Sequence, residues 1–287
     1  QVVMLATLST ILPPARQAGR AVACFNVFGL DEAVRVIAAA ERAEAPVILG
    51  CNKELVRAIP VEVLGAAFGE LAARAHTPVC VHLDHSYDFG VVFRAVRAGF
   101  TSVMYDGSQL SFDENVANTR RVVDVAHACG VSVEGEIGSV AYNEEGNQIR
   151  HELTDPVAAR RFAEETVVDA VAVSVGTVHK LIKQTAKVDH DLLGAIAEAV
   201  RTPLVIHGTS GVPESDLRKM AVGKASKFNI GTVLRRAWGE GLRREFDRRP
   251  EVFDRLTLTQ EPLDALERTA SSMIELLHRP APTPRPA

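Results

Sequence analysis

The sequence has little of what marks membrane-bound and nucleic-acid-binding proteins. No apolar run approaches the length of about 20 residues that a membrane-spanning helix needs. Lysine and arginine number 32 against 36 aspartates and glutamates, so a net charge of -4 offers no basic surface for nucleic acid or anionic lipid. The first residues, Gln1 to Ile11, also lack the charged start and long apolar core of a signal peptide. We therefore expect neither a nucleic acid nor a membrane as partner.

Cysteine is scarce as well. The four cysteines stand singly, mostly inside apolar strand or helix patterns: Cys24, Cys51, Cys80 and Cys129. Their spacing argues against a disulfide framework and against a cysteine zinc site. We expect free thiols in a reducing compartment, which places the protein in the cytoplasm.

The sequence does contain a regular alternation of short apolar strands with amphipathic helices. Strands are expected at 21–27, 46–50, 78–83, 102–105, 132–137, 170–174, 204–206 and 227–230. Helices are expected at 31–44, 61–74, 88–98, 112–128, 156–166, 189–200, 214–222 and 234–248. Eight such units in 287 residues predict an α/β protein with a (β/α)8 TIM barrel. A doubly wound open sheet is the alternative, but no G-x-G-x-x-G follows the first strand.

Two segments exceed a minimal barrel. Residues 138–153 are long, polar and glycine-containing, which predicts a mobile loop after the fifth strand. An additional C-terminal helix is expected at 262–277, followed by a disordered tail at 279–287. Because no linker or shift in composition interrupts the chain, residues 1–287 are expected to form a single domain.

Polar side chains gather where the predicted strands end, and barrel enzymes assemble their catalytic groups at that end. Asp84 and His85 follow the third strand, and His179 and His207 follow the sixth and seventh. Three imidazoles with an open fourth position make a catalytic zinc site. A single histidine is more often a structural residue, but three at one barrel mouth favour the metal. His82 is expected to point away from Asp84.

Glycine-rich turns after the last two strands suit a phosphate. The turn HGTSG at 207–211 leads into a helix, whose N-terminal N–H groups and dipole favour an anion. The turn NIGT at 229–232 repeats the arrangement, and loops after strands seven and eight are the usual phosphate site of barrels. The segment GTVH at 176–179, with Lys183 nearby, adds a third donor group and a cation.

With these motifs the chain resembles the class II, zinc-dependent ketose-bisphosphate aldolases, the family of fructose- and tagatose-bisphosphate aldolases. Matching motifs occur in family order over almost the whole chain and include HLDHS at 82–86, TSVMYDGS at 101–108 and VEGEIG at 133–138. The resemblance implies a metal-dependent aldehyde-lyase of carbohydrate metabolism. It cleaves a ketose 1,6-bisphosphate, fructose 1,6-bisphosphate first, reversibly to dihydroxyacetone phosphate and an aldehyde, glyceraldehyde 3-phosphate. The resemblance also implies a homodimer or homotetramer.

The same resemblance implies residue roles. Asp84 matches the general acid/base, and Glu144, or its neighbour Glu145, is the candidate for a second proton transfer. The implied zinc ligands are His85, His179 and His207. The implied holders of a second divalent or monovalent cation are Asp106 and Glu136. The resemblance places the C1 phosphate at Gly208, Ser210 and Thr232, with Lys183 close by, and the dihydroxyacetone-phosphate part at Asn229. Further candidate substrate contacts, from their places at or near the strand ends, are Asn26, Gly176, Thr209, Gly231 and Arg235, the last for the distal phosphate.

Several departures from the commonest family pattern leave the substrate open. Lys180 stands where many relatives have glycine, and Gly231 stands where fructose-bisphosphate aldolases usually have aspartate. The segment Cys51-Asn52-Lys53 stands where relatives often have serine and glycine. The alternative is therefore an aldolase for a different ketose 1-phosphate, or for a deoxy or modified sugar-acid phosphate.

Other classes are less favoured. A non-catalytic barrel subunit is a further alternative, but the intact set of Asp84 and three histidines argues against it. A Schiff-base aldolase needs a lysine at a strand end, whereas Lys227 opens its strand at the other end. A zinc amidohydrolase would carry a His-x-His pair on the first strand, which this strand lacks.

Overall fold

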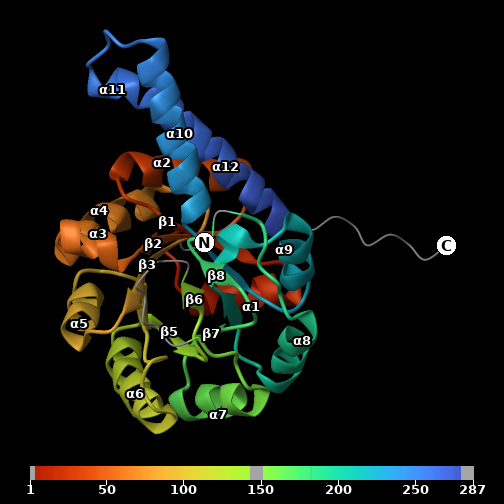
Figure 1. Ribbon diagram of the computed structural model, residues 1–287. Helices are drawn as coiled ribbons and strands as arrows, with labels where there is room; N and C mark the ends of the chain where they lie inside the picture. Colours follow the sequence, from red (N-terminus) through yellow and green to blue (C-terminus); the bar gives the residue numbers. More distant parts are fainter. Residues whose placement is uncertain (1–3, 143–150, 182, 279–287) are drawn as a thin grey trace.

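The computed structural model describes residues 4–142, 151–181 and 183–278, and its core is a closed barrel of parallel strands (Figure 1). Around the barrel the strands are β1 (Val22–Asn26), β2 (Val47–Cys51), β3 (Val79–Ser86), β4 (Ser102–Tyr105), β5 (Ser132–Ile137), β7 (Ala170–Val173), β9 (Leu204–Ile206) and β10 (Lys227–Ile230). Neighbours pair in parallel, and β10 returns to β1 with Val22 opposite Lys227. The predicted TIM barrel is confirmed.

Helices cover the outside of the barrel (Figure 1). They are α2 (Leu30–Arg42), α4 (Val61–Arg74), α5 (Phe89–Arg97), α6 (Phe112–Ala128), α7 (Pro156–Thr166), α8 (His190–Ala199), α9 (Glu214–Ala221) and α10 (Thr232–Arg248). Capping residues mark the first turn of two of these helices. Ser111 and Glu114 form a capping box at α6, and Asp155 caps α7 ahead of Pro156. Local signals therefore explain why α6 and α7 begin where predicted.

The helix α1 (Leu8–Gln17) closes the N-terminal end of the barrel and was not predicted. Pro13 and Pro14 lie inside it, and proline normally argues against a helix interior. Packing overrides that signal, because one face of α1 joins the apolar cluster inside the barrel. The cluster includes Leu8, Ile11, Leu12, Ala15, Cys24, Ile48, Cys80 and Met104.

Smaller elements also escaped prediction. They are α3 (Lys53–Ala58), α11 (Arg255–Leu258), the 3-10 helix η1 (Thr209–Gly211), and a two-stranded parallel sheet of β6 (Ala141–Tyr142) and β8 (Val178–His179). The predicted C-terminal helix is confirmed as α12 (Gln260–His278), which lies beside α10 (Figure 1). The predicted tail at 279–287 lies outside the described residues. Within the described part of the chain, no helix is long and apolar enough to cross a membrane.

Gly65 and Gly69 lie one turn apart on α4 but in different surroundings. A Cβ at Gly65 would lie 2.2 Å from the carbonyl oxygen of Ala98 and 2.9 Å from its carbonyl carbon. A Cβ at Gly69 would meet nothing within 4 Å. The close approach of α4 to the end of α5 therefore depends on the missing side chain at Gly65.

We predict that Gly65→Ala lowers the free energy of unfolding by about 1–3 kcal/mol through overpacking. Gly69→Ala is the matched control and should raise it by roughly 0.5–1 kcal/mol, because alanine favours the helix. Urea denaturation of both variants measures the difference. Effects of the same sign would contradict this packing.

Candidate active site and metal centre

Two neighbouring residues of β3, Asp84 and His85, line the same cavity at the open end of the barrel. Neighbours in a regular strand point to opposite faces. Here the register with β4 shifts between Leu83 and Ser86, and His85 has a φ of 46°. This left-handed conformation is uncommon for a residue other than glycine. It brings the imidazole to the cavity beside the carboxylate.

The three predicted imidazoles come together at this end. His85 lies on β3, His179 ends β8, and His207 directly follows β9. One nitrogen from each ring can be chosen so that all three lie within 4.8 Å of one another. Nε2 of His85 and Nδ1 of His207 are 2.9 Å apart. The barrel thus gathers three potential ligands from distant parts of the chain.

The outer nitrogens of two of these rings are held by carboxylates. Nδ1 of His85 donates to Oδ2 of Asp106 at 2.9 Å, and Nε2 of His207 donates to Oε1 of Glu134 at 2.8 Å. Because the ring protons are held on these outer nitrogens, Nε2 of His85 and Nδ1 of His207 face each other with lone pairs. The lone pairs repel unless a positive charge lies between them, either a proton or a metal ion. Ligand histidines of metal sites are oriented by carboxylates in this way. The residues present therefore fit a metal ion.

The electrostatics favour one positive charge at this place. Burial lowers the pKa of His85, but Asp84, Asp106 and Glu136 outweigh it and raise the pKa to about 10. Burial, and next the charge of His85, lower the pKa of His179 and His207. The other two imidazoles are therefore neutral, as metal ligands must be.

Asp84 is held at both carboxylate oxygens. Nδ2 of Asn26 donates to Oδ2 at 3.0 Å, and Nδ2 of Asn229 donates to Oδ1 at 2.8 Å. Burial alone would raise the pKa of Asp84, but the positive charges of His85 and Lys227 outweigh it and lower the pKa. The carboxylate is therefore ionised and oriented, and it can accept a proton from a hydroxyl group in the cavity.

A second group of possible ligands shares His85 with the first. Ligand atoms of His85, Asp106 and Glu136 lie within 4.8 Å of one another, and all three side chains are buried. Burial, and next the charge of Asp106, raise the pKa of Glu136 well above its usual range. Oε2 of Glu136 has no hydrogen-bond partner among the described residues. These carboxylates would gain from a cation.

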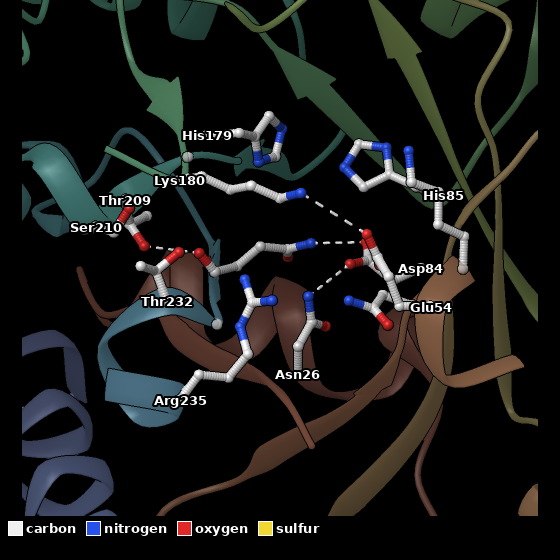
Figure 2. A pocket seen from close by; sticks show the side chains of 15 residues that line it. Asn26, Glu54, Asp84, His85, His179, Lys180, Thr209, Ser210, Thr232 and Arg235 are labelled. Atoms are coloured by element: carbon white, nitrogen blue, oxygen red, sulfur yellow. Dashed lines mark hydrogen bonds and ion pairs between the residues drawn. The ribbon is translucent and has the colours of Figure 1, made fainter. Parts of the chain in front are cut away.

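Two of the three histidines, His85 and His179, line the cavity itself (Figure 2). Of the predicted substrate contacts, it is lined by Asn26, Gly208, Thr209, Ser210, Asn229, Gly231, Thr232 and Arg235. Gly208 has a φ of 67°, and α10 begins at Thr232, so its N-terminus lies at the cavity. The N-terminus of a helix of this length attracts an anion.

Other predicted residues are placed differently. Within the described residues, Gly176 and Lys183 do not line this cavity. The hydroxyl of Thr209 donates to the carbonyl oxygen of Asn229 at 2.7 Å, so it holds the backbone of β10. Glu144 and Glu145 lie outside the described residues.

Sequence reasoning missed a deeper polar layer of His82, Glu134 and Lys227. The expectation that His82 points away from Asp84 is wrong, because residues two apart on a strand share a face. Nδ1 of His82 lies 2.9 Å from Oγ of Ser102, and its Nε2 lies 3.7 Å from Oε2 of Glu134. The signal was in the spacing. Each of the three precedes a site residue on its own strand by two positions, namely Asp84, Glu136 and Asn229.

Lys227 in this layer is a buried cation. Burial lowers its pKa, but Cys24, Glu134 and Asp84 outweigh burial, so the pKa is raised. A Schiff base needs a neutral amine as nucleophile. The ammonium of Lys227 is therefore unsuited to that chemistry, in agreement with the argument from its place on the strand.

Comparison with known proteins points to one group. The family model described as Fructose-bisphosphate aldolase class-II matches residues 6–280. The 6-phospho-5-dehydro-2-deoxy-D-gluconate aldolase of Shouchella clausii is 35% identical over 273 residues, which cover 93% of this chain and 92% of that protein. The sulfofructosephosphate aldolase of Alkalicoccus urumqiensis is 32% identical over 247 residues, covering 85% and 86%. The crystal structure of the YdjI aldolase from Escherichia coli K12 has a TM-score of 0.84 at 30% identity, covering 96% and 98%.

Gly208 allows a matched test of how the site is built. A Cβ there would lie 2.7 Å from the carbonyl carbon of Val178 and 2.9 Å from the backbone nitrogen of His179. Gly223 has a similar φ of 75°, but a Cβ there would meet nothing within 4 Å. Both alanine variants should lose about 1–2 kcal/mol of stability, because alanine is strained in the left-handed conformation.

We predict that only Gly208→Ala weakens zinc binding, by about 10-fold or more, because it displaces the backbone of a ligand. Titration of each apo-protein with zinc against a chromophoric chelator measures the affinity. Equal affinities in the two variants would show that this contact does not position His179.

Proposed function

We propose that this chain, which belongs to the class-II fructose-bisphosphate aldolase family, cleaves a ketose 1-phosphate with zinc held by His85, His179 and His207. Membership makes it an aldolase, a metal-dependent lyase. The proposed products are dihydroxyacetone phosphate and an aldehyde, and the reaction is reversible. The observation that carries the proposal is the pair of imidazole nitrogens facing each other at 2.9 Å beside the ionised Asp84.

Cleavage requires a base for the hydroxyl on C4 and a sink for the electrons of the breaking C3–C4 bond. A bound zinc ion supplies that sink as a Lewis acid. Asp84 accepts the hydroxyl proton and returns it in the synthetic direction, while Asn26 and Asn229 hold its oxygens. Glu144 remains our candidate for the proton transfer at C3. Asp106 and Glu136 are the proposed holders of a second cation.

The C1 phosphate is proposed to bind where two backbone features meet. The turn at Gly208 and Ser210 and the helix start at Gly231 and Thr232 line one side of the cavity. Backbone N–H groups at such a helix start favour an anion. Lys183, from the family resemblance, and Gly176, from its place near a strand end, remain proposed phosphate contacts.

Metal removal tests the reaction class. Chelation should abolish cleavage, and zinc should restore it, because the electron sink is lost and regained. Borohydride added with the substrate should leave activity intact, since no lysine adduct forms. Full activity in a demonstrably metal-free sample would end this proposal.

Asp84→Ala tests the base. We expect cleavage to fall about 10²–10⁴-fold while zinc binding and dihydroxyacetone phosphate binding persist, because the variant loses proton transfer only. Asp88→Ala is the matched control: it removes a nearby carboxylate that caps α5 through Gly90. It should cost stability and leave turnover unchanged. Wild-type turnover in Asp84→Ala would move the role elsewhere.

For the aldehyde half of the substrate, the alternative to fructose 1,6-bisphosphate has specific support. Lys180, which is left-handed with a φ of 59°, extends across the cavity toward Glu54 (Figure 2). Its Nζ lies 3.9 Å from Oε1 of Glu54. The two relatives are named for a deoxygluconate and a sulfofructose, whose far ends carry a carboxylate and a sulfonate. We propose that Lys180 pairs with a small anionic group of this kind.

A substrate panel distinguishes these readings. We expect the wild type to prefer ketose 1-phosphates that end in a carboxylate or sulfonate over fructose 1,6-bisphosphate and fructose 1-phosphate. Lys180→Gly should reduce this preference about 10-fold, the worth of one charged hydrogen bond. Proton exchange into dihydroxyacetone phosphate should not change, and the exposed Lys187→Gly is the control. An unaltered preference, or altered exchange, would contradict the role of Lys180.

We also propose a cytoplasmic location and a homodimer or homotetramer. Cys24, Cys51 and Cys80 are buried free thiols, as expected in a reducing compartment. Beyond the barrel, the segment between α10 and α11 exposes Phe253 and α11 exposes Leu256, with 93% and 74% of their surfaces accessible. Such apolar side chains suit an interface between copies of the chain.

A further inference from the structure

The side chain of Lys227 is fully buried inside the barrel, in the layer below the site. Its Nζ lies 2.7 Å from Oε2 of Glu134 and 2.6 Å from Oδ1 of Asn229. Lysine has three donor hydrogens and no acceptor. The ammonium therefore donates to both groups. Glu134 contacts His207, and Nδ2 of Asn229 contacts Asp84 and also lies 3.2 Å from Nδ1 of His207.

The first contact leads to a proposed metal ligand. Glu134 accepts from Lys227 with Oε2 and from Nε2 of His207 with Oε1, at 2.8 Å. The carboxylate therefore keeps the proton of His207 on Nε2, which leaves Nδ1 to face the other imidazoles. Without the ammonium, Glu134 would be a buried anion with its second oxygen uncompensated, and its position would no longer be defined from below.

The second contact leads to the proposed base. An amide can present either its oxygen or its nitrogen to a neighbour, and the donor partner decides which. Because Oδ1 of Asn229 accepts from Lys227, Nδ2 must turn toward Asp84, where it donates to Oδ1 at 2.8 Å. A flipped amide would place an oxygen against the carboxylate and remove one of the two donors that hold it.

We propose that Lys227 is a positioning residue, whose single buried ammonium orients both the metal ligand His207 through Glu134 and the base Asp84 through Asn229. This inference rests on the proposed function for the roles of His207 and Asp84. Stability alone does not explain the pair, because apolar residues of equal volume often replace a buried ion pair without loss. An apolar pair could not define the orientation of the His207 imidazole or of the Asn229 amide, because it offers them no hydrogen bond.

The metal arm of the test uses a double variant in which no charge is left buried alone. Glu134→Gln keeps a carbonyl oxygen for His207 but is neutral, and Lys227→Met keeps the volume of the lysine. The metal arm compares zinc dissociation constants of the apo-proteins for the wild type, Lys227→Met/Glu134→Gln and the exposed control Lys219→Met. It needs no catalytic activity, so it remains informative if no ketose phosphate is cleaved.

We expect the double variant to bind zinc about 10–100-fold more weakly than the Glu134→Gln single variant, which is measured beside it, because that is the usual cost of disturbing the outer partners of a metal ligand. The control should match the wild type. A folded double variant with the zinc dissociation constant of the Glu134→Gln variant would overturn the metal branch of the inference.

The second arm measures kcat and KM at saturating zinc, with and without Asn229→Leu, all in the Glu134→Gln background. Adding Lys227→Met should lower kcat about 10-fold or more with little change in KM when Asn229 is present, because Asp84 is misoriented. When Asn229 is already leucine, the same change should have less than about a twofold effect, since coupled residues are not additive. An undiminished effect in that background would overturn the route through Asn229. A wild type that cleaves no ketose 1-phosphate would instead reject the proposed function.

Discussion

The site depends on two imidazole nitrogens, Nε2 of His85 and Nδ1 of His207, that face each other at 2.9 Å. Two neutral rings with lone pairs in this arrangement repel, so the fold must supply a positive charge between them. The fold stabilises such a positive charge by placing carboxylates around the two rings, including Asp84, Asp106 and Glu134. A proton satisfies this requirement, and a metal ion held by His85, His179 and His207 would satisfy it as well.

The barrel and the upper layer of the site could be predicted because both repeat along the chain. Each strand–helix unit has its own apolar run and capping residues, and each strand ends in a polar residue that parallel pairing brings to one rim. The deeper layer of His82, Glu134 and Lys227 was not predicted, because a polar residue within an apolar strand looks like an interruption of the apolar pattern. Read with the two-residue period, they lie directly below Asp84, Glu136 and Asn229.

Other features could not be predicted because they arise from tertiary contacts. The left-handed backbone of His85 follows from a register shift between β3 and β4, which no local signal marks. The helix α1 forms despite Pro13 and Pro14 because it is packed against the barrel interior. The direction of Lys180 across the cavity depends on Glu54, which belongs to α3, far from Lys180 in the sequence. Substrate choice rests on such contacts, so the reaction class is easier to infer than the substrate.

The position of α1 has a consequence for the chemistry at the other end of the barrel. Its apolar face packs on Cys24 and Cys80, and Cys24 is close enough to Lys227 to influence its charge. The apolar layer thus separates the buried ion pair from solvent on the N-terminal side. If water entered from below, the higher local dielectric would weaken the pull between Lys227 and Glu134. The orientation that we propose for His207 and Asp84 would therefore depend partly on a helix at the opposite end of the barrel, which insulates the ion pair from solvent.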